Sequence, residues 1–272
     1  MELLFFCPRW GSEQVPWPTF VKKVKDAGYQ GIEWGLPAGT PERELNEAVD
    51  LINKNRLLFI PQHWDTIDSD FNRHHDNYAC WLERVAALPA DKINSQTGKD
   101  YFTVEQNTSL FKLAAAHTKK TGVPVVHETH RGKCLYAAHV AAAYFEKLPG
   151  LRITLDISHW VTVAETYLND QKDAVQTALQ RADHLHARIG HPQGSQITDP
   201  RQTQWQEGKV TFFGWWKELI RLKENSGLNT FTITPEFGPH PYMAMLPSGA
   251  PVCDQWAVNE YIMEALKLQR EE

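Results

Sequence analysis

The stretch GVPVVHETHRGKCLYAAHVAAAYFEKLPGLRITLD, residues 122–156, decides the fold that the sequence predicts. It contains two short apolar runs, at residues 123–127 and 153–155, separated by a helical segment at residues 136–147. Each run begins close after a glycine and is followed at once by an acid. A strand, a helix and a second strand in this order are typical of a βαβ unit, whose two strands are parallel.

The same pattern continues along the chain in both directions. Strands are expected at residues 3–7, 31–34, 57–61, 91–94, 123–127, 153–155, 184–189 and 231–233. Helices are expected at residues 16–27, 41–54, 74–87, 104–121, 136–147, 171–181, 211–225 and 254–269. Gly28, Gly122, Gly150 and Gly227 each follow a helix and precede a strand, where a C-capping glycine belongs.

This alternation predicts an α/β protein with a single domain, residues 1–272, folded as a (β/α)8 TIM barrel. An open, doubly wound sheet is the structural alternative. No GxGxxG motif follows the first strand, so the dinucleotide-binding form of that alternative lacks its main support.

Composition narrows the class of protein. Hydrophobic residues make up 42% and charged residues 22% of the chain, as in a globular domain. The net charge of −5 and the pI near 6.2 disfavour nucleic acid as a partner. The four cysteines form no CxxC pair and are expected to be reduced thiols.

Location and assembly are predicted less directly. The opening MELLFFCPRWG is expected to be a strand, not a signal peptide. No apolar stretch approaches the roughly 18 residues that span a bilayer, so a cytoplasmic protein without a membrane partner is expected. The segment WAVNEYIMEALKLQ could pack against a second copy in a homo-oligomer, or could simply close the barrel.

Four successive strands end in residues that carry chemistry. The carboxyl ends of barrel strands meet at one mouth, where active sites lie. There the chain places Glu128, Asp156, His186 and Glu236. Three carboxylates and an imidazole would repel unless a cation balanced them, so one divalent metal ion is expected. The oxygen-rich set favours Mn²⁺, Mg²⁺ or Co²⁺, and Zn²⁺ is possible.

A single carboxylate at a strand end is more often a helix cap or a salt-bridge partner than a metal ligand. The metal prediction therefore depends on the coincidence across four strands.

These motifs resemble the xylose isomerase-like TIM-barrel superfamily of sugar isomerases and epimerases, which includes ketose 3-epimerases and endonuclease IV. The resemblance covers nearly the whole chain. It rests on GIEW at 31–34, PQH at 61–63, HETHRG at 127–132, LDISHW at 155–160, HLHARIG at 184–190 and PEFGP at 235–239.

The resemblance implies a metal-dependent isomerase or epimerase. The substrate would be a small sugar or polyol-derived ketone, changed by proton transfer next to its carbonyl through an enediolate. Glu128 and Glu236 would be the catalytic acid and base as well as metal ligands. Substrate-binding residues are expected at His63, His159, Arg188, Glu33 and Trp160. Arg188 lies only two residues after the metal-binding histidine, closer than the epimerases place their arginine.

Tryptophans lie near several strand ends, and core packing and stacking on a sugar are equally open roles for them. They are Trp10, Trp34, Trp64 and Trp160. The non-periodic segment at residues 190–208 is expected to be a lid over the site. No clear glycine-rich cradle follows the last two strands, which favours an unphosphorylated substrate.

Other functions stay open at this point. An inosose-type dehydratase would use the same metal site for elimination. A phosphodiesterase of the endonuclease IV type would bind more metal ions and DNA. A sugar-binding protein on a decayed enzyme scaffold would bind its ligand without turnover.

Overall fold

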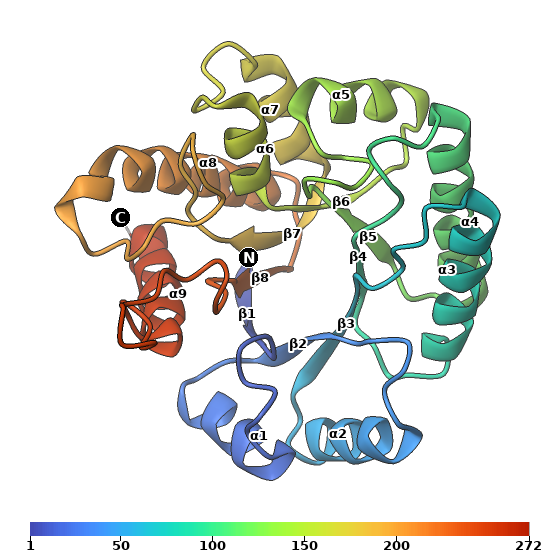
Figure 1. Ribbon diagram of the computed structural model, residues 1–272, viewed down its shortest axis with the longest axis horizontal. Coiled ribbons are helices and arrows are strands. Elements are labelled where there is room, and N and C mark those ends of the chain that lie inside the picture. The colour runs from blue at the N-terminus through green and yellow to red at the C-terminus, as the bar shows by residue number, and fades with distance from the viewer. Residues whose placement is uncertain (272) are drawn as a thin grey trace.

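The computed structural model describes residues 1–271 and is a closed barrel of eight parallel strands, each paired with its neighbours in the sequence (Figure 1). The last strand closes the barrel by pairing with the first, from Glu2 opposite Thr230 to Phe5 opposite Ile233. The strands are β1 (Glu2–Pro8), β2 (Gly31–Gly35), β3 (Leu58–His63), β4 (Ile93–Ser95), β5 (Val125–Glu128), β6 (Ile153–Leu155), β7 (Ala182–Ala187) and β8 (Thr230–Pro235). The predicted (β/α)8 barrel is therefore confirmed.

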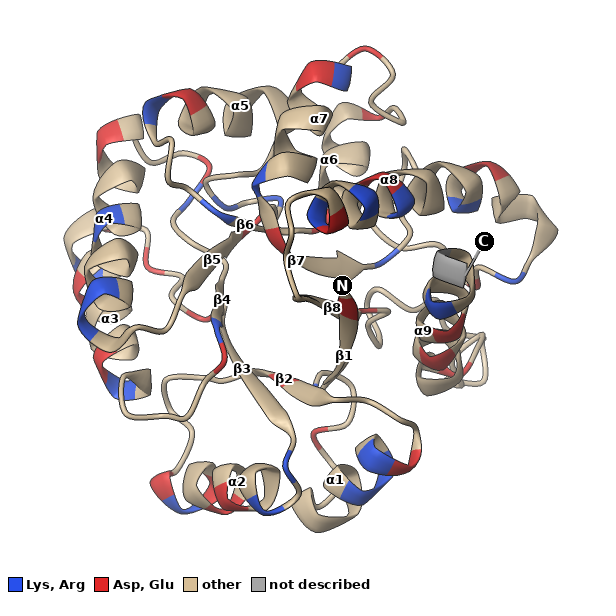
Figure 2. Cartoon of the chain, turned by 180° about the vertical axis from the view of Figure 1, so that it is seen from behind, with Lys and Arg blue, Asp and Glu red and all other residues tan. Residues whose placement is uncertain are grey.

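Helices surround the ring of strands (Figure 1). They are α1 (Trp17–Asp26), α2 (Glu42–Lys54), α3 (Phe71–Val85), α4 (Val104–Thr121), α5 (Ala138–Lys147), α6 (Ile157–Ala164), α7 (Lys172–Arg181), α8 (Gln206–Asn225) and α9 (Gln255–Glu271), with a short 3-10 turn, η1 (Thr203–Trp205). Charged residues of both signs are spread over these outer helices (Figure 2). Among the described residues, no helix is long and apolar enough to cross a membrane, and the four cysteines form no disulfide.

The helix α6 was not among the predicted helices. It begins directly after Asp156, whose Oδ1 accepts a hydrogen bond from the Ser158 backbone N at 3.0 Å. It ends at Glu165, which adopts a left-handed φ of 53°. Only eight residues long and strongly apolar, it is too short for a helical period to be recognised in the sequence.

Two other predictions need correction. Gly122 ends α4 with a φ of 79°, as predicted, but Gly150 is not among the residues with positive φ, and α5 is capped by Leu148. The seventh strand was predicted at 184–189 and lies two residues earlier. The backbone turns at Arg188, whose N–H donates to the His186 carbonyl at 3.1 Å.

Alternation along each strand separates two layers of side chains. In β7, Leu185 belongs to the apolar core between the barrel and the helices. His184 and His186 make their polar contacts with Glu33 of β2, across the inside of the barrel. The interior near the carboxyl ends of the strands is therefore polar, and this end carries the site.

Candidate active site

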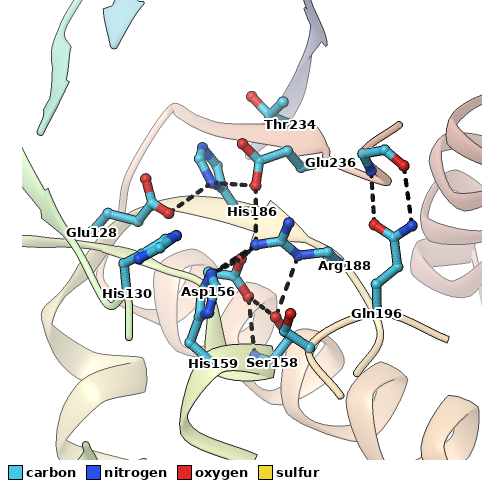
Figure 3. A network of polar contacts seen from close by, with 12 residues as sticks. Glu128, His130, Asp156, Ser158, His159, His186, Arg188, Gln196, Thr234 and Glu236 are labelled. Carbon is cyan, nitrogen blue, oxygen red and sulfur yellow. Dashed lines mark hydrogen bonds and ion pairs between the residues drawn. The ribbon is translucent and has the colours of Figure 1, made fainter. Parts of the chain in front are cut away.

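Four predicted ligands come together at the carboxyl ends of β5 to β8. Glu128 ends β5, Asp156 follows β6, His186 lies in β7 and Glu236 follows β8. One ligand atom from each of the four lies within 4.8 Å of those of the other three, and all four residues are buried. Figure 3 shows Glu128 and Glu236 on either side of the His186 ring.

The barrel register explains why these residues meet. Glu128 lies opposite Thr154 of β6, two residues before Asp156. His186 lies opposite Thr234 of β8, two residues before Glu236. Strand ends at similar levels bring side chains far apart in the sequence to one place.

The four residues fit a divalent cation. The Nδ1 atom of His186 is buried and has no hydrogen-bond partner, although the Glu236 Oε2 lies only 2.9 Å from it. The Glu128 Oε1 lies 3.8 Å from the same atom. An unpartnered ring nitrogen beside buried carboxylate oxygens is the arrangement that a metal ion would complete.

Charge at the site points in the same direction. Burial, together with the charges of Glu236 and Asp156, raises the pKa of Glu128 to about 7. Burial also raises the pKa of Asp156. Burial alone would lower the pKa of His186, but Glu236, Glu33 and Glu128 outweigh it and raise that pKa well above its ordinary value. The carboxylates thus need a positive charge among them.

Arg188 supplies one positive charge and lies in the wall of the cavity beside the site. Its Nη2 forms a short ion pair with the Asp156 Oδ2 and lies 3.5 Å from the Glu236 Oε2. Burial alone would lower the pKa of Arg188, but Asp156 and Glu236 raise it. The same Nη2 lies 2.9 Å from the Nε2 of His159. Arg188 therefore links the carboxylates of Asp156 and Glu236 to His159 (Figure 3).

Glu33, a predicted substrate-binding residue, lies beneath the site and is not among the residues that line its cavity. Its Oε1 lies 3.0 Å from the Nε2 of His186 and its Oε2 lies 3.0 Å from the Nε2 of His184. Burial would raise the pKa of Glu33, but the two histidines lower it well below its ordinary value. A carboxylate on the far nitrogen orients a metal-binding imidazole and makes its other nitrogen a stronger ligand.

The carboxylate of Glu128 is held by amides that sequence reasoning did not single out. Gln62 Nε2 donates to its Oε2 at 3.2 Å, and Gln96 Nε2 lies 3.3 Å from both oxygens. Asn94 Nδ2 donates to the Glu128 Oε2 at 3.1 Å and to the Glu33 Oε1 at 2.9 Å. The motif PQH at 61–63 contains Gln62 directly before the histidine that the sequence indicates.

His63, the predicted substrate-binding residue of this motif, lies on the other face of β3. Successive residues of a strand point to opposite faces, so Gln62 faces the cavity and His63 faces the helices. The His63 ring packs 4.6 Å from that of Tyr78 and 4.9 Å from that of Trp81, both on α3. His63 is fully buried and does not line the cavity.

His159 and Trp160 are also set back from the cavity. The His159 ring stacks on that of His130, with centroids 3.8 Å apart. His130 itself reaches the wall, and its Nδ1 donates to the Arg131 carbonyl at 2.6 Å. Trp160 is fully buried in the core, and its Nε1 donates to the Leu135 carbonyl at 2.8 Å. His159 contacts Arg188 and holds it in place, and Trp160 packs in the hydrophobic core.

One cavity of about 530 Å³ leads from the site toward β1, β2 and β3. The residues at its inner end are Gln62, Gln96, Glu128, His130, Arg188, Glu236 and Tyr242. The wall also contains Arg9, Trp10, Glu13, Trp34, Glu44 and Trp64. Three of the four tryptophans named from the sequence thus reach the cavity, and Trp160 does not.

The segment at 190–208 packs beside the site, and none of its residues lines the cavity, so its description as a lid is corrected. Gln196 pairs with the backbone of Gly238, accepting from its N–H at 2.7 Å and donating to its carbonyl at 3.1 Å (Figure 3). Ser195 accepts a short hydrogen bond from Arg131. These contacts fasten the segment to the ends of the neighbouring strands.

Comparisons with known proteins agree with this fold. A family model described as xylose isomerase-like TIM barrel matches residues 21–240. The structure of the probable 3-DHS dehydratase AsbF from Bacillus anthracis has a TM-score of 0.60 and 14% identity, covering 98% of this chain and 99% of that chain. The catalytic domain of Thermobifida fusca endoglucanase Cel5A has a TM-score of 0.52 and 9% identity, covering 98% and 91%. At these identities the likeness is one of fold. A search of curated proteins gave no match.

Proposed function

The chain belongs to the xylose isomerase-like TIM-barrel family, and from that premise we propose that it is a metal-dependent sugar isomerase or epimerase. The substrate would be a small sugar or polyol-derived ketone, and the reaction a proton transfer next to its carbonyl through an enediolate. The observation that carries the proposal is the pair Glu128 and Glu236, which flank one ring nitrogen of His186 at the inner end of a cavity.

The metal ion would be held by Glu128, Asp156, His186 and Glu236. When bound, it supplies positive charge beside the reacting carbonyl, where negative charge develops during proton removal. Manganese, magnesium and cobalt suit these donors best, and zinc is compatible with them.

The residues of the chain account for the proton transfer. Glu128 and Glu236 come from β5 and β8, so a substrate between them meets a carboxylate on each side. One carboxylate removes the proton and the other returns it. The amides of Gln62 and Gln96 hold Glu128 in place, and Arg188 holds Glu236 near its position. Placement of this kind supplies much of the rate for a weak base.

Deuterium exchange tests the proposal. The purified protein is incubated in D2O with a panel of ketoses and inososes and with Mn²⁺ or Co²⁺, and the substrate is followed by NMR. We expect deuterium to appear on the carbon next to the carbonyl. Glu128→Gln should reduce exchange at least about a hundredfold, the low end for general acid–base catalysis. Full exchange by that variant with its metal retained would disprove the role of Glu128.

Metal analysis of the same preparations tests the site separately. Wild-type protein is expected to hold one divalent ion per chain, and Glu236→Ala and His186→Ala are expected to lose it. Glu146→Ala, which changes an exposed acid on α5, is the matched control and should keep the metal. Near three zinc ions per chain would favour a phosphodiesterase instead.

Elimination of water is the second candidate reaction. It begins with the same proton removal, and His130 stands in the cavity wall with Glu128 as a second group able to deliver a proton to a departing hydroxyl. The NMR experiment separates the two reactions, because a dehydratase yields a new unsaturated product that absorbs in the ultraviolet.

A further inference from the structure

The cavity extends well beyond the residues that the proposed chemistry needs. We call the part lined by Trp10, Trp34, Trp64, Arg9, Glu13 and Glu44 the outer chamber. Trp10 lies at its border with the inner end, because the Arg188 Cζ is 6.0 Å from the Trp10 ring centroid. The whole cavity measures about 530 Å³, and pockets of roughly 300–1,000 Å³ take drug-sized ligands. It therefore has room for a ligand longer than the single sugar ring that the inner end would hold.

The indole rings of Trp64 and Trp10 pack directly against glycine residues, which we call their glycine seats. A Cβ added to Gly35 would lie 3.1 Å from the Trp64 Nε1 and 3.2 Å from its Cδ1. A Cβ added to Gly238 would lie 2.0 Å from the Trp10 Cη2. Trp64 is nevertheless 43% exposed, and Trp10 is partly exposed. Core packing does not explain an indole that is held against the backbone with much of its surface open.

Trp34 and Arg9 form a part of the wall that is held by contacts within the protein. Trp34 is buried and packs edge-on against Trp17 at 4.7 Å. The Arg9 guanidinium lies 4.4 Å from the Trp17 ring centroid, and its Nη2 donates to the Val15 carbonyl at 2.7 Å. Its Nη1 has no hydrogen-bond partner among the described residues. This wall is already ordered, so a ligand would not lose affinity by ordering it.

Hydrogen-bonding groups stand among the aromatic rings. The carboxylates of Glu13 and Glu44 belong to exposed residues in the same wall as Arg9. A sugar ring suits such a surface, because its C–H faces pack on indoles and its hydroxyls can donate to carboxylates and accept from a guanidinium. A purely aromatic group would cover these charged groups without pairing them, which is unfavourable.

We propose that the outer chamber binds a second sugar ring, so that the preferred substrate is a glycosylated ketose and not a free monosaccharide. The identity of the reacting end rests on the proposed function. The presence of the second ring rests on the size of the cavity and on the aromatic and charged side chains of the outer chamber.

Calorimetry tests this inference without relying on turnover. The purified protein, supplied with Mn²⁺, is titrated with fructose and with three glucosyl-fructoses: turanose, maltulose and palatinose. These carry the glucose on O3, O4 and O6, so they sample different directions out of the inner end. We expect at least one disaccharide to bind at least about tenfold more tightly than fructose, the effect of one well-stacked aromatic ring.

Variants identify the chamber as the cause. Trp64→Ala should weaken the preferred disaccharide about tenfold and leave fructose unchanged, and Trp64→Phe should restore part of the loss. Tyr101→Ala removes an aromatic ring that is 62% exposed and lies outside the cavity. It should change neither affinity. Unchanged thermal unfolding would show that each variant is folded.

Several results would overturn the inference. They are equal affinity for fructose and all three disaccharides, equal losses for both ligand types in Trp64→Ala, and tighter binding of phenyl glucoside than of any disaccharide. The last result would assign the chamber to an aromatic group. Disaccharide binding without deuterium exchange would contradict the proposed function but keep the chamber. Exchange on fructose without any preference for a disaccharide would do the reverse.

Discussion

His186 is held between two carboxylates, and its two ring nitrogens have different tasks. Nε2 faces Glu33 at 3.0 Å, and Nδ1 faces Glu236 at 2.9 Å. Because Glu33 accepts the Nε2 proton, Nδ1 is the nitrogen left for a metal. The Glu33 carboxylate thus fixes the orientation of the His186 imidazole.

Replacing Glu33 by Gln should therefore weaken metal binding. The amide keeps the shape but loses the charge, and changes behind a metal ligand typically reduce affinity about 10- to 100-fold. Competition titration with a chromophoric chelator measures the change. Glu146→Gln on the surface of α5 is the matched control. Unchanged affinity in Glu33→Gln would mean that Glu33 only fills space.

We expect Arg188 and a metal ion to neutralise the negative charge of the carboxylates together. Arg188→Met leaves Asp156 and Glu236 without their guanidinium. Loss of one partner of a buried pair costs about 3–5 kcal/mol of unfolding free energy. We expect that loss in urea denaturation with a chelator present, and a smaller loss with saturating Mn²⁺. Equal losses under both conditions would show that Arg188 and the metal act independently.

At the scale of the element, the ends of α4 and α5 provide a matched pair of glycines. Gly122 has a φ of 79°, and Gly150 is not among the residues with positive φ. A Cβ at either position would meet nothing within 4 Å. Gly122→Ala should thus lose about 1–2 kcal/mol from backbone strain alone, and Gly150→Ala should be neutral or slightly stabilising. Thermal denaturation of the two variants measures the difference, and equal unfolding temperatures would contradict it.

Local pattern was enough to predict the eight strands and that Glu128, Asp156, His186 and Glu236 lie together, because each βα repeat carries its own signals. Local pattern was not enough to predict the position of side chains that depends on how strands and helices pack together. Gln62 and His63 are neighbours, and only the barrel register determines which of them faces the cavity. Asp156 is predicted as a metal ligand from its place at a strand end, but its role as the cap of α6 depends on a backbone turn.

The segment at 190–208 shows the same limit at greater range. Its length and composition predicted a lid. Its position depends on the pairing of Gln196 with Gly238, which lies 42 residues farther along the chain. Nothing in the local sequence indicates that contact.

At the scale of the whole molecule, buried neutral histidines should make the protein sensitive to acid. Burial lowers the pKa of His74 from 6.5 to about 4. Between these pH values the unfolded chain binds a proton that the folded chain does not, so the free energy of unfolding falls as the pH drops. For His74 the slope is about 1.4 kcal/mol per pH unit.

Urea denaturation at several pH values between about 7 and 4.5 measures how the free energy of unfolding changes with pH. His74→Gln should flatten the decline, because the variant has no proton to take up at that position. His139→Gln, an exposed histidine on α5, should leave the decline as it is. A decline of the same steepness in all three proteins would exclude His74 as a contributor.

The contact between Trp10 and Gly238 has a consequence for how the protein folds during its synthesis. Trp10 is made long before its seat at Gly238 and the neighbouring Glu236. A ribosome-bound chain therefore carries an unfinished cavity until its eighth strand has emerged. The complete set of four ligands therefore exists only once the eighth strand is in place, so completion of the barrel and readiness for chemistry arrive together.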